Sequence, residues 1–531
     1  MLLFMQKRTD TMNASMLKSL MNTEAYPVKA TTVELVQTHV SWIFLTDTHA
    51  FKIKKPVNFG FLDFSTLEKR RFYCDEEVRL NRRLCPDIYL GVIELRQTGD
   101  KATFTGDGPV LDFAVMMKRL PADRMLDKLV EKGEATVDMM ENIASVISSF
   151  HQKADSSQYI SEFGSPDKIM FNWNENFDQI KSYLGRTLPA SEYDAICSWV
   201  YKFAANNSDL FKRRVEQGYI RECDGDLHLE NICLIEDKVH IFDCIEFNER
   251  FRYCDTAADI AFLLMDLDFH GHSDLANAVH AAYSTYSNDI DLDKIVDFYK
   301  VYRAFIRGKV ESFLLDDSNV DLETRQIAYK RAIRYFRLAR GYCERTRLHP
   351  TLFITCGTMG CGKSTLARQL SFELGISTYN SDSVRKIRAG IHAVGSRQEQ
   401  YGQGIYNNQF TGQVYEKLKE LAAHELVAGR SVVIDASFRK ASDRADFSAL
   451  ADLHNANFVV LFVFCNDNLQ QERLKSRTAL GNSVSDGRVE LLEYQRSEFE
   501  RPETKEGRVI ELDAIYPTEQ MASTVYKELA Q

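Results

Sequence analysis

The sequence predicts two folded parts, an α+β part at the N-terminus and an α/β part with a parallel sheet at the C-terminus. In the N-terminal part the strand candidates come first and a mostly helical stretch follows, which indicates a small sheet-rich lobe joined to a larger helical lobe. In the C-terminal part strands and helices alternate, which is typical of a parallel sheet covered on both faces. A length of 531 residues fits this division, because so long a chain exceeds one hydrophobic core.

The strand candidates are short apolar runs. In the N-terminal part they lie at residues 42–45, 50–53, 90–95 and 112–117. In the C-terminal part they lie at residues 352–355, 377–380, 431–434, 458–465 and 509–512. Helical stretches separate the C-terminal runs, so we expect these strands to run parallel.

A domain boundary is expected near residue 348. Helical periodicity runs from about residue 322 to 347, and His349-Pro350 stops it directly before the first C-terminal strand. The first residues of the chain are rich in Met and polar side chains. We therefore expect a loose tail over residues 1–24, one domain over 25–347 and another over 348–531.

Composition excludes several classes of protein. With 44% hydrophobic residues the chain is neither disordered nor fibrous, and a formal charge of −10 with a pI near 5.7 gives no basic surface for long nucleic acid. The longest apolar run, residues 458–465, has the length of a strand rather than of a membrane span. Eleven cysteines without a CxxC pair form neither a disulfide framework nor a zinc site. We expect a cytoplasmic protein without a membrane partner and leave its oligomeric state open.

Residues 357–364 complete the GxxxxGK[ST] pattern of a phosphate loop between a predicted strand and a predicted helix. Glycines let the backbone wrap a polyphosphate so that N–H groups and the helix N-terminus face its oxygens. Lys363 is expected to reach the β- and γ-phosphates and act in catalysis, and Ser364 to bind Mg²⁺. The expected ATP-binding residues are Gly357, Thr358, Met359, Gly360, Cys361, Gly362, Lys363, Ser364 and Thr365.

A second phosphotransfer motif lies in the N-terminal part. Asp226 and Asn231 have the spacing D-x4-N, and Asp243 follows two apolar runs that predict a β-hairpin. The hairpin would return Asp243 to the neighbourhood of Asn231. In a phosphotransferase such a first Asp takes the proton of the attacking hydroxyl, while the Asn and the second Asp bind Mg²⁺.

A lysine and a glutamate upstream extend this site. Lys52 lies in an A-x-K sequence on a predicted strand, and Lys54 is its rival because it shares the strand face. The helix that follows is expected to open with a capping box over residues 65–68. Glu77 lies on the apolar face of that helix, and we expect it to pair with Lys52 at the nucleotide.

These residues resemble the aminoglycoside phosphotransferase branch of the protein-kinase-like fold, over roughly residues 25 to 345. The stretch 224–231 resembles that family's HGDxxxxN loop, with Asp224 in the place of its His. The resemblance implies that Asp243 binds the metal and that Asp259 braces the catalytic loop. The N-terminal part has no GxGxxG motif to cover the phosphates. Either the turn at residues 46–49 covers them, or no segment has that role. The alternative is a kinase-like lobe that binds nucleotide poorly and regulates or presents a substrate.

Nearly the whole chain after residue 25 resembles a bacterial family that fuses an aminoglycoside-phosphotransferase-like domain to a P-loop ATP-binding kinase domain. The resemblance rests on residues 38–42, 54–57 and 61–66 together with the two motifs above. It implies a protein-kinase-like two-lobe fold at the N-terminus and a P-loop fold at the C-terminus. It leaves the substrate open, because one fold hosts many functions.

Residues downstream of the phosphate loop are candidates for binding the acceptor and the metal. Asp382 and Arg385 follow the second C-terminal strand, at the edge where ligands bind in open α/β sheets. They resemble the acceptor-binding Asp and Arg of gluconate kinases and polynucleotide 5′-kinases, which implies that Asp382 orients the acceptor hydroxyl in catalysis and Arg385 binds an acceptor anion. A helix N-cap is the other interpretation of Asp382. Asp435 ends a strand and has the position of a metal-binding Walker B carboxylate.

Arg473 and Arg477 are candidates for catalytic lid residues. They lie four apart on one helix face, before the glycine-bearing segment 481–487. A lid helix of this kind would bring two guanidinium groups onto the developing charge of a phosphoryl group. A solvated helix face is the alternative.

Together these patterns predict an ATP- and Mg²⁺-dependent phosphotransferase whose acceptor is a hydroxyl of a small sugar-like or amino-sugar-like molecule. One alternative is a kinase of nucleic-acid 5′ ends. Another is an ATP-hydrolysing switch with a non-catalytic kinase-like domain.

Overall fold

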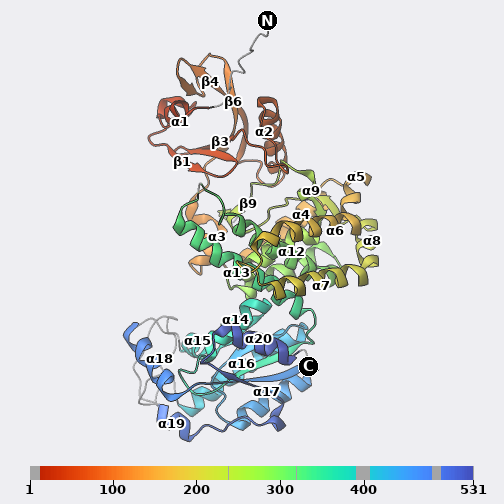
Figure 1. The fold of residues 1–531 in the computed structure, drawn as a ribbon, viewed down its shortest axis with the longest axis vertical. Helices are drawn as coiled ribbons and strands as arrows, with labels where there is room; N and C mark the ends of the chain where they lie inside the picture. The colour runs from red at the N-terminus through yellow and green to blue at the C-terminus, as the bar shows by residue number, and fades with distance from the viewer. Residues whose placement is uncertain (1–11, 237, 319, 390–406, 481–491, 530–531) are drawn as a thin grey trace. The chain divides into compact units, whose positions relative to one another are not determined.

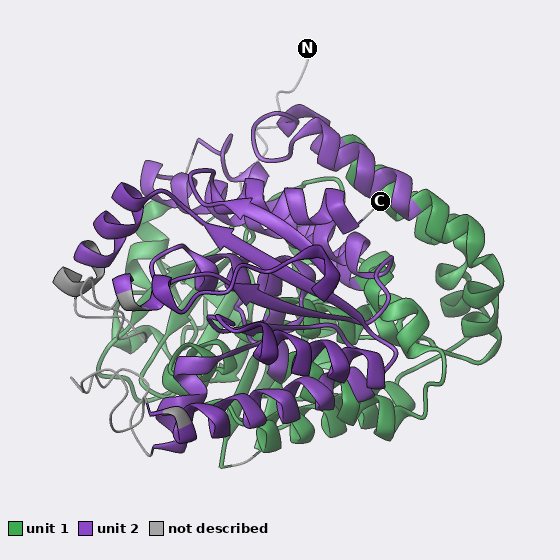
Figure 2. Cartoon of the chain, turned by 90° about the horizontal axis from the view of Figure 1, so that it is seen from below, with its two compact units in different colours: residues 1–178, 201–266, 275–299 green, residues 179–200, 267–274, 300–531 purple. Residues whose placement is uncertain are grey.

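The computed structural model describes residues 12–236, 238–318, 320–389, 407–480 and 492–529. The chain divides into two compact units, coloured separately in Figure 2. Unit 1 comprises residues 1–178, 201–266 and 275–299, and unit 2 comprises residues 179–200, 267–274 and 300–531. A helix with the length and apolarity to span a bilayer is absent from the described residues.

Unit 1 begins with a six-stranded antiparallel sheet in the order β1-β2-β3-β6-β4-β5 (Figure 1). Its strands are β1 (Glu34–Gln37), β2 (Ser41–Leu45), β3 (His49–Lys54), β4 (Tyr89–Thr98), β5 (Lys101–Thr103) and β6 (Val110–Lys118). The four predicted strands are confirmed as β2, β3, β4 and β6. The sequence analysis missed β1 and β5, because these short edge strands bury few side chains and so carry no apolar run.

Helix α2 (Leu67–Asn81) packs against β4 and β6 and carries Glu77 into the interior of the lobe. Its N-cap is Thr66, whose hydroxyl accepts the Lys69 N–H. The capping box predicted from Ser65 therefore begins one residue too early. The reason is that Asp63 already holds Ser65, accepting both its N–H and its hydroxyl.

The loose tail predicted for residues 1–24 is wrong for residues 12–24, and residues 1–11 lie outside the described part of the chain. Helix α1 (Ala14–Ser19) is capped by Asn13, whose side chain accepts the Met16 N–H. Leu20 is fully buried in the core of the sheet lobe, and the Tyr26 hydroxyl donates to the Leu20 carbonyl at 2.5 Å. Apolar burial thus fixes this segment, which the polar composition of the tail concealed.

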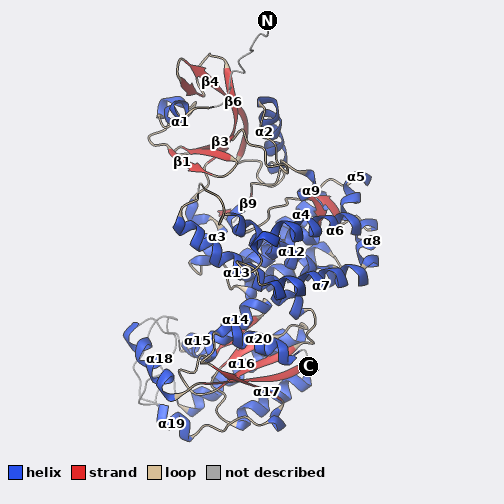
Figure 3. Ribbon diagram, in the orientation of Figure 1, coloured by secondary structure: helices blue, strands red, loops and turns tan. Residues whose placement is uncertain are grey.

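A helical stretch follows the sheet, as predicted, and Figure 3 separates its helices from the strands. The helices are α3 (Leu126–Glu131), α4 (Val137–Lys153), α5 (Gln158–Ser161), α6 (Pro166–Ile180), α7 (Ala190–Asn206), α8 (Ser208–Glu216), α9 (Glu249–Arg252), α10 (Thr256–Phe269), α11 (Ser273–Ser287), α12 (Leu292–Phe313) and α13 (Leu322–Arg345). Two small antiparallel pairs interrupt them: β7 (Ile220–Glu222) with β10 (Tyr253–Asp255), and β8 (Ile232–Ile235) with β9 (Lys238–Ile241). The second pair is the predicted hairpin.

Unit 2 contains a five-stranded parallel sheet in the order β12-β13-β11-β14-β15. The strands are β11 (Thr351–Cys356), β12 (Ser377–Asn380), β13 (Val432–Asp435), β14 (Asn457–Phe464) and β15 (Arg508–Asp513). The helices are α14 (Lys363–Leu374), α15 (Ser381–Arg388), α16 (Asn408–Val427), α17 (Ala441–Leu453), α18 (Asp467–Leu480), α19 (Leu492–Ser497) and α20 (Thr518–Leu529). Apolar side chains of α14 and α20 pack in one core cluster with the sheet, and those of α16 and α17 in another. All five predicted strands and the parallel α/β class are confirmed.

Within unit 2, helix α13 packs against α14. Gly341 of α13 lies so close to α14 that a Cβ there would stand 1.7 Å from the Glu373 carbonyl oxygen. Arg345 donates to the carbonyls of Leu374 and Gly375, at 3.1 and 2.7 Å. Helix α13 therefore belongs to the same compact unit as the parallel sheet, whereas the boundary predicted from the sequence lies after this helix. The boundary near residue 348 stays a prediction.

Candidate active sites

The phosphate loop turns from β11 into α14 through backbone conformations that favour glycine. The angle φ is +140° at Gly357, +79° at Gly360 and +100° at Gly362. Lys363 lies folded across the loop, where its ammonium donates to the Thr358 carbonyl at 2.8 Å. The residues predicted to bind phosphate therefore form one compact turn at the start of a helix.

Two glutamines hold the tip of this loop. Gln470 of α18 is buried, and its amide donates to the Thr358 hydroxyl at 2.7 Å and to the Met359 carbonyl at 2.5 Å. Gln495 of α19 accepts the Met359 N–H at 3.0 Å. Arg496 donates to the side-chain carbonyl of Gln470 at 2.7 Å. These three residues were not predicted from the sequence, because they stand in no local motif and only the fold brings Gln470 and Gln495 to the loop and Arg496 to Gln470.

Asp382 and Arg385 lie at the start of α15, at the carboxyl end of β12. Asn380 caps this helix, because its side-chain oxygen accepts the N–H groups of Asp382 and Ser383, both at 3.0 Å. The N-cap interpretation of Asp382 is therefore wrong. Asp382 is partly exposed and pairs with the buried Arg385 at 3.1 Å. The pair places an oriented carboxylate at the ligand-binding edge of the sheet.

Asp435 ends β13, the strand between β12 and the phosphate-loop strand β11. The Thr355 hydroxyl donates to one carboxylate oxygen at 3.2 Å, and the Asn380 amide donates to the other at 2.6 Å. Each carboxylate oxygen keeps acceptor capacity beyond these bonds. Asp435 and the Ser364 hydroxyl are oxygen donors of the kind that Mg²⁺ prefers, so this donor set fits the predicted metal.

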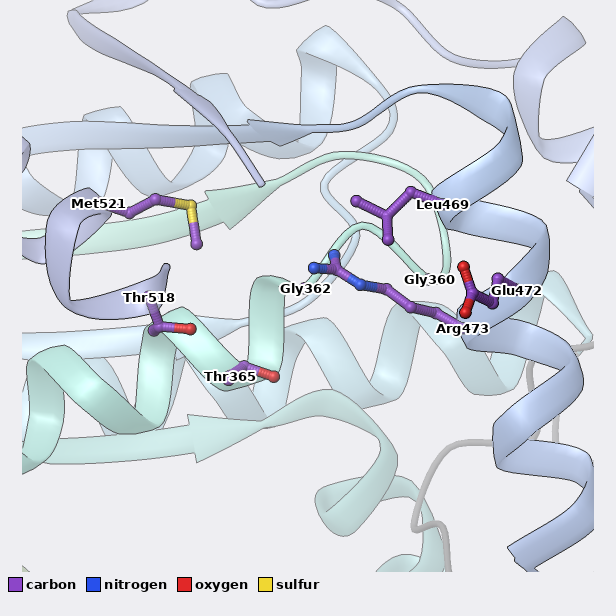
Figure 4. Close-up of a pocket in the computed structure, with 8 residues that line it drawn as sticks. All are labelled: Gly360, Gly362, Thr365, Leu469, Glu472, Arg473, Thr518 and Met521. Carbon is purple, nitrogen blue, oxygen red and sulfur yellow. The ribbon is translucent and has the colours of Figure 1, made fainter. Parts of the chain in front are cut away.

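A cavity of about 360 Å³ opens beside the phosphate loop (Figure 4). It is lined by Gly360, Gly362, Thr365, Leu469, Glu472, Arg473, Thr518 and Met521. Arg473 extends from α18 toward the loop, and its guanidinium donates to the carbonyls of Cys361 at 3.3 Å and Ala514 at 2.9 Å. Arg473 thus lies against the loop backbone at the wall of this cavity. The side chain of Arg477 and the segment 481–487 lie outside the described residues.

The N-terminal site lies in unit 1 and is built around two buried lysines of β3. Lys52 donates to the Asp243 carboxylate at 2.5 Å and lies 2.9 Å from an oxygen of Glu77. Burial acts to lower the pKa of Lys52, but Asp243 and Glu77 outweigh it and hold this pKa well above its ordinary value. Lys52 is therefore a fixed cation between α2 and the residue that follows the hairpin.

Lys54 contacts the same glutamate from the same strand. Its ammonium lies 2.6 Å from the second oxygen of Glu77 and also binds Glu246. Burial acts to raise the pKa of Glu77, yet Lys52 and Lys54 together lower it to about 2. Glu77 thus forms an ion pair with both lysines. The two lysines differ in their second carboxylate partner, which is Asp243 for Lys52 and Glu246 for Lys54. The sequence analysis missed Glu246, which only the fold brings to β3.

Asp226 and Asn231 lie on the loop between β7 and β8. The Asn231 amide donates to the Asp226 carboxylate at 3.2 Å and to the Asp226 backbone carbonyl at 3.0 Å. His228 Nε2 lies 3.4 Å from the same carboxylate. The hairpin returns the chain to this loop, because the Phe242 N–H donates to the Asn231 carbonyl at 3.0 Å. Asp243 follows with a φ of +63°, a conformation that non-glycine residues rarely adopt outside constrained sites.

The carboxyl group of Asp224 is buried within this loop. One oxygen accepts the Asp226 N–H at 3.1 Å, and the other has no hydrogen-bond partner in the part of the chain that the structure describes. Burial and then the nearby Asp259 carboxylate raise the pKa of Asp224 well above its ordinary value. Asp259 accepts the N–H groups of Asp224 at 3.0 Å and Gly225 at 2.8 Å, and it contacts His151 at 3.1 Å. These bonds fix the backbone just before Asp226, in the place where the resemblance implies a brace, and the catalytic role of this loop stays a prediction.

The turn at residues 46–49 contacts the segment that follows β6. The Arg119 N–H donates to the Thr48 carbonyl at 2.9 Å, and the Arg119 guanidinium donates to the Thr46 carbonyl at 2.9 Å. The turn at the other end of β2, residues 38–40, adjoins Lys55, whose N–H donates to the Val40 carbonyl at 2.7 Å. The turn at residues 38–40 thus lies at the Lys54 end of β3, and the phosphate-covering role of residues 46–49 stays a prediction.

Comparison with known proteins identifies the C-terminal fold. Residues 352–502 match the family model of the AAA domain. This segment contains the phosphate loop, Asp382, Arg385 and Asp435. Residues 352–502 are therefore similar to this family, and we call this segment the AAA domain. The match thus covers the segment in which the structure has the phosphate loop and the parallel strands β11 to β14.

Two mycobacterial relatives match most of the chain. An uncharacterized protein of Mycobacterium tuberculosis strain H37Rv is 29% identical over 425 residues, which cover 80% of this chain and 82% of that protein. An uncharacterized protein of Mycobacterium bovis matches to the same extent. The match therefore extends well beyond the AAA domain.

Solved structures resemble parts of the chain. A putative kinase from Chloroflexus aurantiacus is 20% identical with a TM-score of 0.29 and covers 34% of this chain and 98% of its own. A gluconokinase from Sinorhizobium meliloti is 20% identical with a TM-score of 0.26, and the match covers 35% of this chain and 94% of the gluconokinase. A choline/ethanolamine kinase family protein from Mesorhizobium loti is 11% identical with a TM-score of 0.37, and the match covers 62% of this chain and 99% of that protein.

Proposed function

We propose that the protein is an ATP- and Mg²⁺-dependent kinase that phosphorylates an alcohol hydroxyl of a small sugar-like or amino-sugar-like metabolite. The observation that carries this proposal is the phosphate loop of the AAA domain together with the Asp382–Arg385 pair at the carboxyl end of β12, the strand on the far side of β13. The loop supplies a polyphosphate site, and the pair supplies a proton acceptor beside a buried positive charge. A nucleotide-driven switch would require the phosphate loop but would not require an acceptor-binding pair such as Asp382 and Arg385.

Each proposed site residue of the AAA domain has a separate role in phosphoryl transfer. Lys363 has to leave the Thr358 carbonyl to neutralise charge on the transferring phosphoryl group. Asp382 accepts the proton of the attacking hydroxyl, and Arg385 binds an anionic group of the acceptor. Ser364 and Asp435 would hold Mg²⁺, which when bound neutralises the phosphate charge.

The cavity beside the loop suits the nucleobase. Leu469 and Met521 offer apolar contacts, and the planar guanidinium of Arg473 can stack on an aromatic ring. This role differs from the lid role predicted for Arg473, because its guanidinium bonds to backbone carbonyls on the cavity wall.

We infer a second phosphotransfer site in the N-terminal part. Its support is the convergence of Lys52, Glu77 and Asp243, from three separate segments of the chain, within contact of one another. Lys52 would bind the nucleotide phosphates, and Asn231 and Asp243 would hold Mg²⁺. Asp226, beside Asn231, would take the acceptor proton.

The test is transfer of labelled γ-phosphate into a small-molecule extract by the full-length protein. Three proteins are compared: the wild type, Lys363→Ala and Asp226→Asn. We expect labelled metabolites with the wild type and a product missing in each variant. ATP hydrolysis that needs no acceptor and yields no labelled metabolite would favour the switch and contradict this proposal.

A further inference from the structure

Gln495 of α19 is bound to the phosphate loop by only one half of its side-chain amide. The Met359 N–H donates to the amide oxygen at 3.0 Å. Because this neighbour is a donor, the carbonyl oxygen faces it and the NH2 group is left to donate elsewhere. In the part of the chain that the structure describes, the NH2 group has no hydrogen-bond partner. Gln495 therefore keeps two N–H donors beside the loop.

Gln470 of α18, the other glutamine at the loop, uses both halves of its amide. Its NH2 group donates to the Thr358 hydroxyl at 2.7 Å and to the Met359 carbonyl at 2.5 Å. Its oxygen accepts from Arg496 at 2.7 Å. An amide has one acceptor oxygen and two N–H donors, so Gln470 is fully engaged within the protein. Gln470 thus shapes the loop, whereas Gln495 can also bind a ligand.

The position of Gln495 is fixed by its neighbours. The next residue, Arg496, joins α19 to α18, since its guanidinium donates to the Asp467 carboxylate at 2.5 and 3.3 Å. Helix α18 packs closely on the loop, because a Cβ at Gly360 would stand 3.0 Å from Leu474 Cγ. The two helices therefore hold the Gln495 amide beside the loop before any nucleotide binds.

Gln495 binds the same peptide unit on which Lys363 rests. The Lys363 ammonium donates to the Thr358 carbonyl at 2.8 Å, and this carbonyl and the Met359 N–H belong to one peptide bond. A lysine of this motif reaches the β- and γ-phosphates, while the N–H groups at the start of the helix bind the inner phosphates. The peptide bond between Thr358 and Met359 thus lies toward the outer end of the polyphosphate.

We propose that Gln495 donates its NH2 group to the terminal phosphate of ATP, so that the loop distinguishes ATP from ADP. This contact rests on the proposed binding of ATP by the phosphate loop and adds a residue to that site. The amide oxygen stays on the Met359 N–H, so the donor is preorganised and the loop does not have to rearrange. ADP lacks the terminal phosphate and therefore gains nothing from Gln495.

The experiment measures nucleotide binding to the full-length protein by calorimetry. The two ligands are Mg²⁺-ADP and the Mg²⁺ complex of the β,γ-imido analogue of ATP, which is not hydrolysed. Nucleotide that still binds to Lys363→Ala belongs to the N-terminal part and is subtracted. Gln495→Leu should raise the ratio of the Kd for the ATP analogue to the Kd for ADP roughly 10- to 100-fold, as loss of a hydrogen bond to a charged group does. The ratio is compared because a change in loop shape raises both Kd values alike.

Two further variants separate a phosphate contact from a structural role. Gln495→Glu keeps an oxygen for the Met359 N–H but replaces the donor with a negative charge, so it should raise the ratio at least as much as Gln495→Leu does. Gln470→Met removes the fully engaged amide and should weaken the binding of both nucleotides without changing the ratio. An unchanged ratio in Gln495→Leu, or binding of the ATP analogue restored by Gln495→Glu, would overturn the proposal.

These titrations contain no phosphoryl acceptor, so they test binding apart from transfer. If Gln495→Leu changes the ratio while the wild type labels no metabolite, the proposed kinase reaction is wrong and the contact stands. If the wild type labels a metabolite while the ratio stays unchanged, the kinase reaction stands and the contact is overturned.

Discussion

The two candidate sites are built in opposite ways. The AAA domain presents one continuous loop whose shape comes from three glycines with positive φ and from the helix it opens. The N-terminal site is assembled from β3, α2 and the residues after a hairpin, and its central contact joins Lys52 to Asp243, 191 residues away in sequence. The first site depends on backbone geometry, and the second depends on buried charge.

This difference has a consequence for nucleotide binding. In the AAA domain Lys363 is held by one neutral carbonyl, which a phosphate can replace at little cost. In the N-terminal site two lysines face Glu77, Glu246 and Asp243, so the protein's own carboxylates already satisfy the cations. A nucleotide has to compete with these carboxylates for Lys52. We therefore expect the N-terminal site to bind ATP more weakly than the AAA domain does.

Removing the proposed proton acceptor should give the largest effect. Asp226→Asn keeps the size of the side chain and should lower N-terminal transfer by about 10²–10⁴-fold, because general-base catalysis contributes on that order. The measurement is the turnover of labelled γ-phosphate in a Lys363→Ala background, which silences the AAA domain. Asp209→Asn, at a carboxylate with an 87% exposed side chain, is the matched control and should change nothing. Unchanged turnover in Asp226→Asn would demote the N-terminal part to a regulatory role.

Lys54→Met and Lys52→Met should separate a lysine that stabilises the fold from a lysine that binds the nucleotide. Without Lys54, Glu246 loses its lysine and Glu77 keeps only Lys52, and breaking a buried ion pair usually costs about 3–5 kcal/mol. Chemical denaturation should show this loss in the free energy of unfolding. Lys52→Met should weaken ATP binding more than Lys54→Met does at matched stability. Equal losses of ATP binding in the two variants would contradict the division of roles between these lysines.

Lys363→Ala should break the AAA domain site alone. Loss of a preorganised charge on the transferring group costs on the order of 10²–10³ in rate, or ~3–4 kcal/mol. Transfer of the product assigned to the AAA domain should fall by that factor, with the fold intact by circular dichroism. Lys505→Ala removes a lysine with a 76% exposed side chain and should leave the rate unchanged. Full activity of Lys363→Ala would refute the phosphate-loop assignment.

Asp224→Asn should produce the smallest effect, a change in how stability depends on pH. The charged groups that face Asp224 are Asp259, Asp226 and Arg83, and its pKa is raised from 3.8 by burial and then by Asp259. An acid with a raised folded-state pKa contributes stability that is complete below its unfolded pKa and is lost as the pH rises toward the folded pKa. Asparagine does not titrate, so the melting temperature of the variant relative to the wild type should increase from pH 5 to pH 8. A constant difference across this range would show that Asp224 is ionised throughout.

The contrast between the two sites also explains how much the sequence could predict. The parallel sheet and the phosphate loop follow from apolar runs and glycine spacing, which are local, and the structure agrees with them. The pairing of Lys52 with Glu77 follows from strand and helix periodicity in the same way. Gln470 and Gln495 carry no such signal, because each meets the loop from a helix placed by the tertiary fold.

Errors at element ends have equally local causes. The capping box fails at Ser65 because Asp63 already binds that residue. The N-cap interpretation of Asp382 fails because Asn380, two residues earlier, accepts the same N–H groups that a cap would. In both cases a neighbouring polar side chain, rather than helix propensity, sets where the helix begins.

The most direct test of two phosphotransfer sites in one chain is the number of ATP molecules bound at saturation, measured by equilibrium dialysis with labelled ATP and Mg²⁺. We expect two ATP molecules per chain for the wild type, with the weaker site lost in Lys52→Met and the tighter site lost in Lys363→Ala. The variant that combines both substitutions should bind none. A wild type that binds one ATP, and a Lys363→Ala variant that binds none, would rule out the N-terminal nucleotide site and leave a single P-loop kinase joined to a kinase-shaped domain that binds no nucleotide.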